Sequence, residues 1–195
     1  MKKQILIMSA FMIGTFAACS QDKHEHHEKK EDAIVKTNAD TKQTPTVNSK
    51  ASASIREIVT KYIDLKNAFV NDNSNQAASA GKALESAFKN FDKKDLTPDQ
   101  KKGYEDVQDD AREHAEHIGA NGGNIEHQRE HFVMLSKDIY DLIKALGSPQ
   151  PLNKMFCPMA NDGKGAFWLS EYKEVKNPYF GKKMMTCGTV KEEIK

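Results

Sequence analysis

The chain has 195 residues, of which 29 are basic and 28 are acidic, so its formal net charge is +1. This balance lacks the excess of basic residues that nucleic-acid-binding proteins carry, and we expect no nucleic-acid partner. After subtraction of an N-terminal signal peptide and a linker, the remaining length is that of one domain with a short additional segment.

Residues 1–18 have the pattern of a secretory signal peptide. Lys2 and Lys3 precede an apolar run from Ile5 to Ala18, which is shorter than the roughly 20 residues that a membrane-spanning helix needs. Small residues before Cys19 are typical of a bacterial lipoprotein cleavage site, after which Cys19 carries the lipid. The alternative is an ordinary secretory cleavage that leaves a spare thiol. In both cases we expect the mature protein in the cell envelope, in the periplasm or at the outer membrane, where disulfides persist. In the lipoprotein reading, membrane contact is through the lipid anchor only.

Residues 19–51 are polar and poor in aromatic side chains. Such a composition cannot bury enough apolar surface to fold, so the segment is predicted to be a flexible lipoprotein tether. It carries His24, His26 and His27, and His-rich tracts can hold metal ions. The alternative interpretation is a solvated linker that happens to contain histidines.

Residues 52–148 are predicted to form an antiparallel, up-down four-helix bundle, because apolar residues recur there at three- and four-residue steps. Thr97 followed by Pro98 is a strong start signal, and Gly147 with Pro149 is a stop signal. The expected helices span residues 52–71, 75–91, 97–118 and 124–146.

Residues 149–195 are predicted to be mostly irregular and to pack on the bundle. Gly, Pro, Asn and Asp are frequent there, and only Ala166 to Leu169 has the pattern of a brief strand. The segment is too short for an independent core. The predicted fold class is therefore all-α, a four-helix bundle that carries a Cys-, Met- and Trp-rich C-terminal segment.

Two pairs of sulfur residues in this segment form the first candidate site. Met159 lies close to Cys157, Met184 lies close to Cys187, and Trp168 lies between the pairs. Soft thiolate and thioether ligands suit copper(I) and silver(I), whereas methionine is not a usual ligand of zinc. The alternative is a Cys157–Cys187 disulfide with methionines filling gaps around it. Residue types and spacing leave both interpretations open.

The hairpin between the third and fourth predicted helices holds the second candidate site. His114 and His117 are three residues apart before the turn, and His127 and His131 are four apart after it, so each pair lies on one side of its helix. Imidazoles that converge at this end can bind copper or zinc. The alternative is one buried, hydrogen-bonded histidine and three solvated ones paired with nearby glutamates.

An enzyme is not expected from this sequence. The cysteines lie in no strand-turn-helix context that would activate a nucleophile. No pair of catalytic carboxylates stands out from the abundant surface acids.

The C-terminal segment resembles a bacterial domain family of unknown function. The residues that carry the resemblance are Cys157-Pro158-Met159-Ala160, Gly163-Lys164-Gly165-Ala166, Trp168-Leu169-Ser170, Asn177-Pro178-Tyr179-Phe180-Gly181 and Met184 with Thr186-Cys187-Gly188. Upstream, His117-Ile118, the run from Ile125 to Phe132 and Leu135-Ser136 are also similar to the family. Its members are exported lipoproteins, and the domain is also fused to periplasmic adaptor subunits of copper/silver efflux pumps of the RND type.

The resemblance implies an envelope lipoprotein that binds copper(I) or silver(I) and buffers the metal or delivers it to an efflux adaptor. The expected metal ligands are Cys157, Met159, Met184, Cys187, His117 and His131. The heavy-metal-binding segment of the same efflux systems carries a histidine after its methionine, which is absent here, so the role of Met159 stays open. One alternative is a non-catalytic interaction module stapled by a Cys157–Cys187 disulfide. Another is a bundle whose histidines recognise a small ligand or an envelope component.

Overall fold

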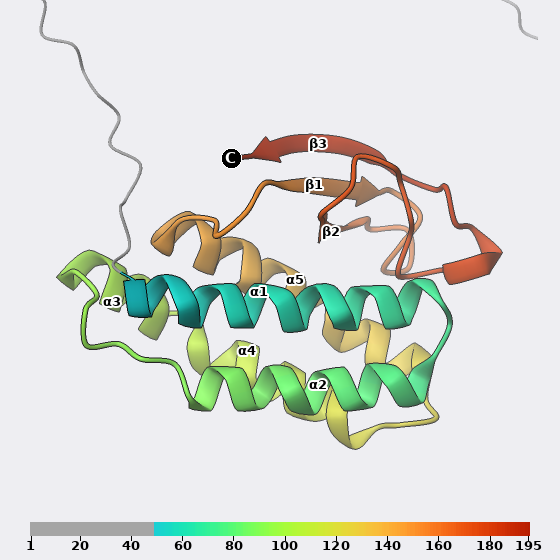
Figure 1. The fold of residues 1–195 in the computed structure, drawn as a ribbon. Helices are drawn as coiled ribbons and strands as arrows, with labels where there is room; N and C mark the ends of the chain where they lie inside the picture. Colours follow the sequence, from blue (N-terminus) through green and yellow to red (C-terminus); the bar gives the residue numbers. More distant parts are fainter. Residues whose placement is uncertain (1–48) are drawn as a thin grey trace, which may run out of the picture. The chain divides into compact units, whose positions relative to one another are not determined.

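The computed structural model describes residues 49–195 (Figure 1). The expected signal peptide, Cys19, and the three histidines His24, His26 and His27 lie outside the described residues. No helix within the described part of the chain is long and apolar enough to cross a membrane.

Helices occupy the predicted positions, with bounds that shift by a few residues. They are α1 (Ser49–Val70), α2 (Ser74–Lys89), α3 (Pro98–Glu105), α4 (Gln108–Ala120) and α5 (Ile125–Leu146). The third predicted helix is thus divided into α3 and α4 by a turn at Asp106 and Val107. Thr97 caps α3 as expected, because its side chain accepts a hydrogen bond from the Gln100 amide and the Gln100 side chain accepts one from the Thr97 amide.

The helices pack in the order of a hairpin-connected bundle. Helix α1 packs against α2, α2 against α4, and α4 against α5, and Figure 1 shows α1 and α2 running side by side. The contact between α2 and α4 is close at Gly81, where a Cβ atom would lie 2.9 Å from the Ala115 carbonyl oxygen and 2.9 Å from the Gly119 amide nitrogen. Only a residue without a side chain lets the two backbones approach this closely.

The prediction of an all-α fold with a mostly irregular C-terminal segment is wrong. The residues after α5 form an antiparallel sheet with the strand order β2-β1-β3. The strands are β1 (Leu152–Cys157), β2 (Ala166–Ser170) and β3 (Thr189–Ile194). The brief strand expected at Ala166 to Leu169 is confirmed as β2. The fold of the described residues is therefore α+β, with the sheet segregated from the helices.

The two missed strands lack a regular alternation of apolar and polar residues. The register between β1 and β3 shifts between Lys154 and Met155, which breaks the period of β1. Strand β3 is an edge strand whose side chains are mostly exposed, and it carries Lys191, Glu192 and Glu193. Charged residues on an edge discourage pairing with other chains but also hide the strand from pattern analysis.

One face of the sheet is buried against the helices. Met155 and Trp168 are cross-strand partners, and neither side chain is exposed. Figure 1 shows the sheet on the side of α1 and α5, with α2 and α4 on the other side. The Tyr62 hydroxyl joins the layers, since it accepts a hydrogen bond from the Leu169 amide at 3.0 Å and shares one with Ser136 at 2.9 Å.

A loop between β2 and β3, which contains the short helix η1 (Gly181–Lys183), is fastened to the helices by Arg129. The guanidinium donates to the carbonyl oxygen of Pro178 at 2.7 Å, to that of Phe69 at 2.9 Å and to the carboxylate of Asp72 at 2.7 Å. One side chain of α5 thereby connects the end of α1 with the C-terminal segment.

Candidate metal centre

Three imidazoles converge between the end of α4 and the start of α5. His117, His127 and His131 each offer one ring nitrogen, and these three atoms lie within 4.8 Å of one another. Each is at least partly accessible to solvent. This is the only such group of His, Cys, Asp or Glu side chains among the described residues.

His131 is the centre of the cluster. The ring of His117 stacks on it with centroids 4.4 Å apart and an interplanar angle of 11°, and the ring of His127 meets it edge-on at 4.7 Å. The Nδ1 atoms of His114 and His131 are 3.2 Å apart, a hydrogen bond in which either ring can donate. The cluster therefore joins all four histidines of the helical hairpin.

Hydrogen bonds to neighbouring side chains hold the rings of His127 and His131, as is usual for histidines that bind metal ions. The Nδ1 atom of His127 lies 3.2 Å from a carboxylate oxygen of Glu130, and that of His131 is held by His114. These bonds leave the Nε2 atoms of His127 and His131 available to a metal ion. A histidine ligand generally gives its other ring nitrogen to a carboxylate or a similar partner.

Burial favours the neutral form of two of the clustered histidines, His131 and His114. Burial, followed by the neighbouring rings of His117, His114 and His127, lowers the pKa of His131. Burial also lowers the pKa of His114, although the nearby Glu113 and Asp110 oppose this. Neutral imidazole is the form that binds metal ions, so the lowered pKa of His131 favours its role as a ligand.

The hairpin that presents these rings is held by Gln128, which is fully buried. Its side-chain amide donates to the carbonyl oxygens of Ile118 at 2.9 Å and Ser74 at 3.1 Å, and it accepts a bond from the Ser74 hydroxyl at 2.7 Å. The Ser74 hydroxyl in turn accepts a bond from the Gly123 amide at 2.8 Å. Gln128 therefore has a structural role, because it stabilises the hairpin. The partly exposed histidines on either side of it have no such role in the packing of the bundle.

The two cysteines form a separate pair at the sheet. The sulfur atoms of Cys157 and Cys187 are 2.7 Å apart, and both cysteines are free thiols. Cys157 is buried, whereas Met159 is 56% exposed and Met184 is half-buried. The hydrogen bond with Cys157, with burial, raises the pKa of Cys187, although the Met159 amide opposes this. A raised pKa disfavours the reactive thiolate form of Cys187.

The structure thus brings four of the six predicted ligands together, in two separate pairs. Cys157 lies beside Cys187, and His117 lies beside His131, but no cysteine belongs to the imidazole group. His127, which sequence reasoning placed in the hairpin but not among the expected ligands, joins the imidazole group. Its four-residue spacing from His131 was the available signal.

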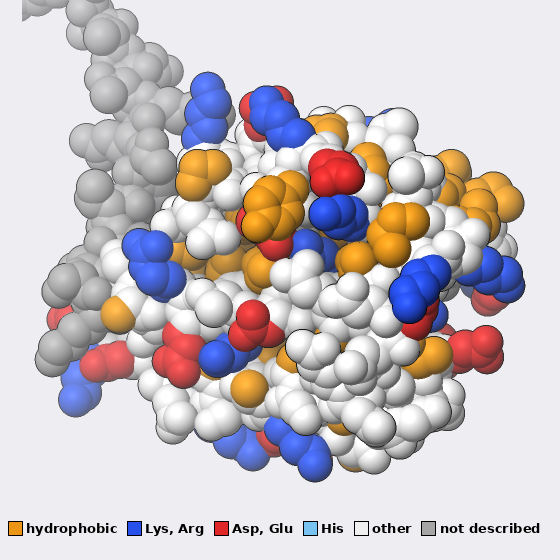
Figure 2. Space-filling view, turned by 45° about the vertical axis from the view of Figure 1, so that its right-hand side comes forward, with side chains coloured by type: hydrophobic (Ala, Val, Ile, Leu, Met, Phe, Trp, Pro, Cys, Tyr) orange, Lys and Arg blue, Asp and Glu red, His pale blue; other side chains and the backbone are white. Residues whose placement is uncertain are grey.

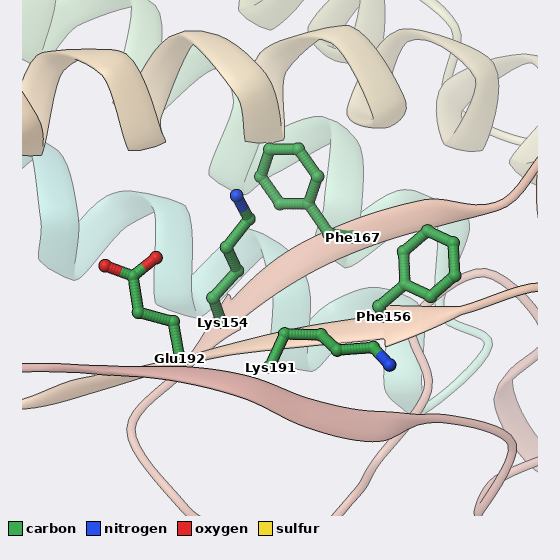
Figure 3. A pocket seen from close by; sticks show the side chains of 5 residues that line it. All are labelled: Lys154, Phe156, Phe167, Lys191 and Glu192. Carbon is green, nitrogen blue, oxygen red and sulfur yellow. The ribbon is translucent and has the colours of Figure 1, made fainter.

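A shallow groove of about 440 Å³ on the sheet is lined by Lys154, Phe156, Phe167, Lys191 and Glu192 (Figure 3). The Lys154 ammonium lies 3.6 Å from the centre of the Tyr140 ring and 4.2 Å from that of Phe167, and Glu192 accepts a 2.7 Å bond from the Tyr140 hydroxyl. These groups mainly join the sheet to α5. On the face shown in Figure 2, hydrophobic side chains are interspersed with charged ones.

Residues 58–150 match the model of a family described as "protein of unknown function (DUF3347)". The match covers most of the helical part, including all four clustered histidines, and ends before β1. No curated protein and no solved structure matches the chain. The match supports the presence of a domain similar to this family of unknown function at residues 58–150.

Proposed function

We propose that this protein binds copper, and that His117, His127 and His131 are the ligands. The convergence of their three ring nitrogens within 4.8 Å supports the proposal most directly. The second partners at Glu130 and His114 support it further, because a set of solvated surface histidines does not require oriented rings.

Copper is favoured among the metals that imidazole binds. Nitrogen donors suit zinc, copper, nickel and iron, and copper forms the most stable complexes of the first-row divalent ions. The resemblance of the C-terminal segment to domains fused to copper/silver efflux adaptors points to the same metal. We propose further that the protein is an envelope lipoprotein, anchored through Cys19, that buffers copper or delivers it to such an adaptor.

The sulfur atoms are arranged less favourably for a shared ion. With metal–thiolate bonds of about 2.3 Å, two sulfurs 2.7 Å apart would subtend an angle of only about 70° at the metal. The thiols would have to separate before they could bind copper(I) or silver(I) together with Met159 and Met184. We therefore assign the principal site to the imidazoles.

The test is a competition titration of the full chain with copper(I), copper(II) and zinc(II) against chromophoric chelators. A variant with His117, His127 and His131 all replaced by Ala should lose high-affinity copper binding. The matched control replaces His24, His26 and His27 by Ala and should retain it. Equal copper affinity in the wild type and the first variant would refute the imidazole site.

A second candidate function rests on the short distance between the two thiols. Oxidation would join Cys157 at the end of β1 to Cys187, just before β3, and would fix the C-terminal sheet as a docking module. A loop of this length closed by a disulfide stabilises the folded state by about 3 to 4 kcal/mol. Mass spectrometry of exported protein under non-reducing conditions tests this, because a pair that remains fully reduced excludes the staple.

A further inference from the structure

A methionine lies on the same stripe of α5 as two of the clustered histidines. Met134 follows His131 by three positions and His127 by seven, and residues at these spacings share one face of an α-helix. Long side chains on a helix lean toward its N-terminus and cover the preceding turn. We therefore expect the Met134 side chain to lean toward the turn that carries His131.

The core does not account for Met134. Its side chain is 49% exposed, and it is one of few large hydrophobic side chains on the surface of the described residues. The neighbouring Leu135, Ser136 and Ile139 supply the buried face of α5 at this level. An exposed thioether about one helical turn from His131 is accessible to a metal ion.

We infer that the thioether of Met134 is the fourth ligand of the imidazole site. The inference rests on the proposed function, because it completes the set that His117, His127 and His131 begin. Three imidazoles leave one position of a four-coordinate ion open. A thioether in that position is a soft ligand that suits copper(I), and it is not a usual zinc ligand. Met134 would thus set the preference of the site for copper(I).

The test uses the substitution Met134→Leu, which keeps the size and helix propensity of the side chain but removes the sulfur. The matched control is Met185→Leu, because Met185 is a partly exposed methionine that is not among the expected ligands. Both variants are made in the full chain with Cys19, Cys157 and Cys187 all replaced by Ser, so that no cysteine can supply a sulfur signal. Circular dichroism confirms that each variant is folded.

Two measurements on this set are decisive. Competition with bicinchoninate should show that Met134→Leu weakens copper(I) binding by about tenfold or more, the scale of loss seen when a supporting metal contact is removed, while zinc(II) affinity is unchanged. X-ray absorption at the copper edge should show a sulfur neighbour in the parent and in Met185→Leu but not in Met134→Leu.

The outcomes separate this inference from the proposed function. If the parent binds copper through the histidines, yet shows no sulfur neighbour and no loss in Met134→Leu, the fourth-ligand assignment is overturned and the imidazole site stands. If Met134→Leu weakens the binding of copper(I) and zinc(II) equally, the methionine affects the structure of the site and not its preference for copper(I). This result also overturns the assignment. If the histidine variant described above binds copper as well as the wild type, both proposals fail.

Discussion

The ammonium group of Lys66 lies 2.8 Å from a carboxylate oxygen of Glu171, where α1 meets the residue that follows β2. The Lys66 side chain is only 1% exposed, and Asn67 donates a further bond to the same carboxylate at 3.3 Å. Burial lowers the pKa of Lys66, against the effect of Glu171. Burial alone would raise the pKa of Glu171, but its bonds with Lys66 and Asn67 bring it below its usual range.

Removal of one partner of this pair should be costly. We expect Glu171→Gln to destabilise the protein by about 3 kcal/mol or more, because a buried ammonium then lacks its counter-charge. Denaturant unfolding measures the loss. The double variant Lys66→Met with Glu171→Gln should recover most of it, and a double variant no more stable than Glu171→Gln alone would show that the charge pair is not the cause.

The same pair predicts instability in acid. Because the folded-state pKa of Glu171 is below its unfolded-state value, its contribution is complete at neutral pH and is lost as the pH falls through the folded-state pKa. Wild-type stability should therefore fall below about pH 4.5 more steeply than that of the double variant. Parallel thermal melts from pH 3 to pH 7, at roughly unit intervals, make the comparison; identical profiles would contradict the assignment.

Asp138 should have the opposite dependence on pH. Burial, assisted by Asp110 and Asp141, raises its pKa to about 6, although Lys137 opposes this, and one carboxylate oxygen is buried without a hydrogen-bond partner. Between its unfolded-state pKa and about 6 the folded state binds more protons, so stability falls as the pH rises through this window. We expect Asp138→Asn to remove this fall and to be the more stable protein at pH 7.5, by up to about 3 kcal/mol.

A suitable control for Asp138→Asn is Asp141→Asn, which changes the partner of Lys137 at 3.1 Å. The carboxylate of Asp141 makes an exposed ion pair, so its replacement should alter stability by less than about 1 kcal/mol. Urea unfolding of both variants at pH 4 and pH 7.5 provides the measurement. A fall of stability across this window that persists in Asp138→Asn would place its origin elsewhere.

Gly81→Ala should destabilise the bundle even though alanine is the better helix former. The gain from helix propensity is about 1 kcal/mol, but the new methyl group would lie 2.9 Å from backbone atoms of α4 that cannot turn away. Overpacking of this kind costs about 1 to 3 kcal/mol. Thermal unfolding should show a lower midpoint, and an increased midpoint would mean that α2 and α4 are less closely packed than described.

Arg129→Lys should loosen the C-terminal segment without unfolding the helices. A lysine cannot make the separate bonds that Arg129 makes to Asp72 and Pro178. We expect faster amide hydrogen exchange in the loop between β2 and β3 and little change in α2 and α4. The control Arg112→Lys removes only a 3.7 Å surface ion pair with Glu116 and should leave exchange in that loop unchanged.

The helices could be predicted from the sequence because each one buries a single face, which places apolar residues at three- and four-residue steps. The core residues Tyr62, Leu84, Ile118 and Phe132 are all fully buried. The strands were harder, because the irregular register at Lys154 and Met155 and the charged edge strand β3 give no period-two pattern. The apolar side chains of the C-terminal segment are buried by contact with α1 and α5. Such long-range contacts leave no pattern in the local sequence.

The candidate site was only partly predictable for a related reason. The spacing of His114 and His117, and of His127 and His131, correctly indicates two same-face pairs. Which rings meet across the hairpin depends on the Gln128 and Ser74 hydrogen bonds that set the turn. Sequence spacing also cannot show that the histidines meet between α4 and α5 while the two cysteines meet at the sheet, so the prediction places all six expected ligands in one site.

Strand β3 also protects the rest of the sheet from other molecules. It covers one edge of β1, whose residues Leu152, Met155 and Cys157 belong to the core, and it turns charged side chains outward instead. A protease that trimmed the chain after Gly188 would leave β1 with an open row of backbone donors and acceptors beside apolar side chains. Such a product would be prone to self-association, so the acidic and basic residues near the C-terminus help to keep the protein soluble.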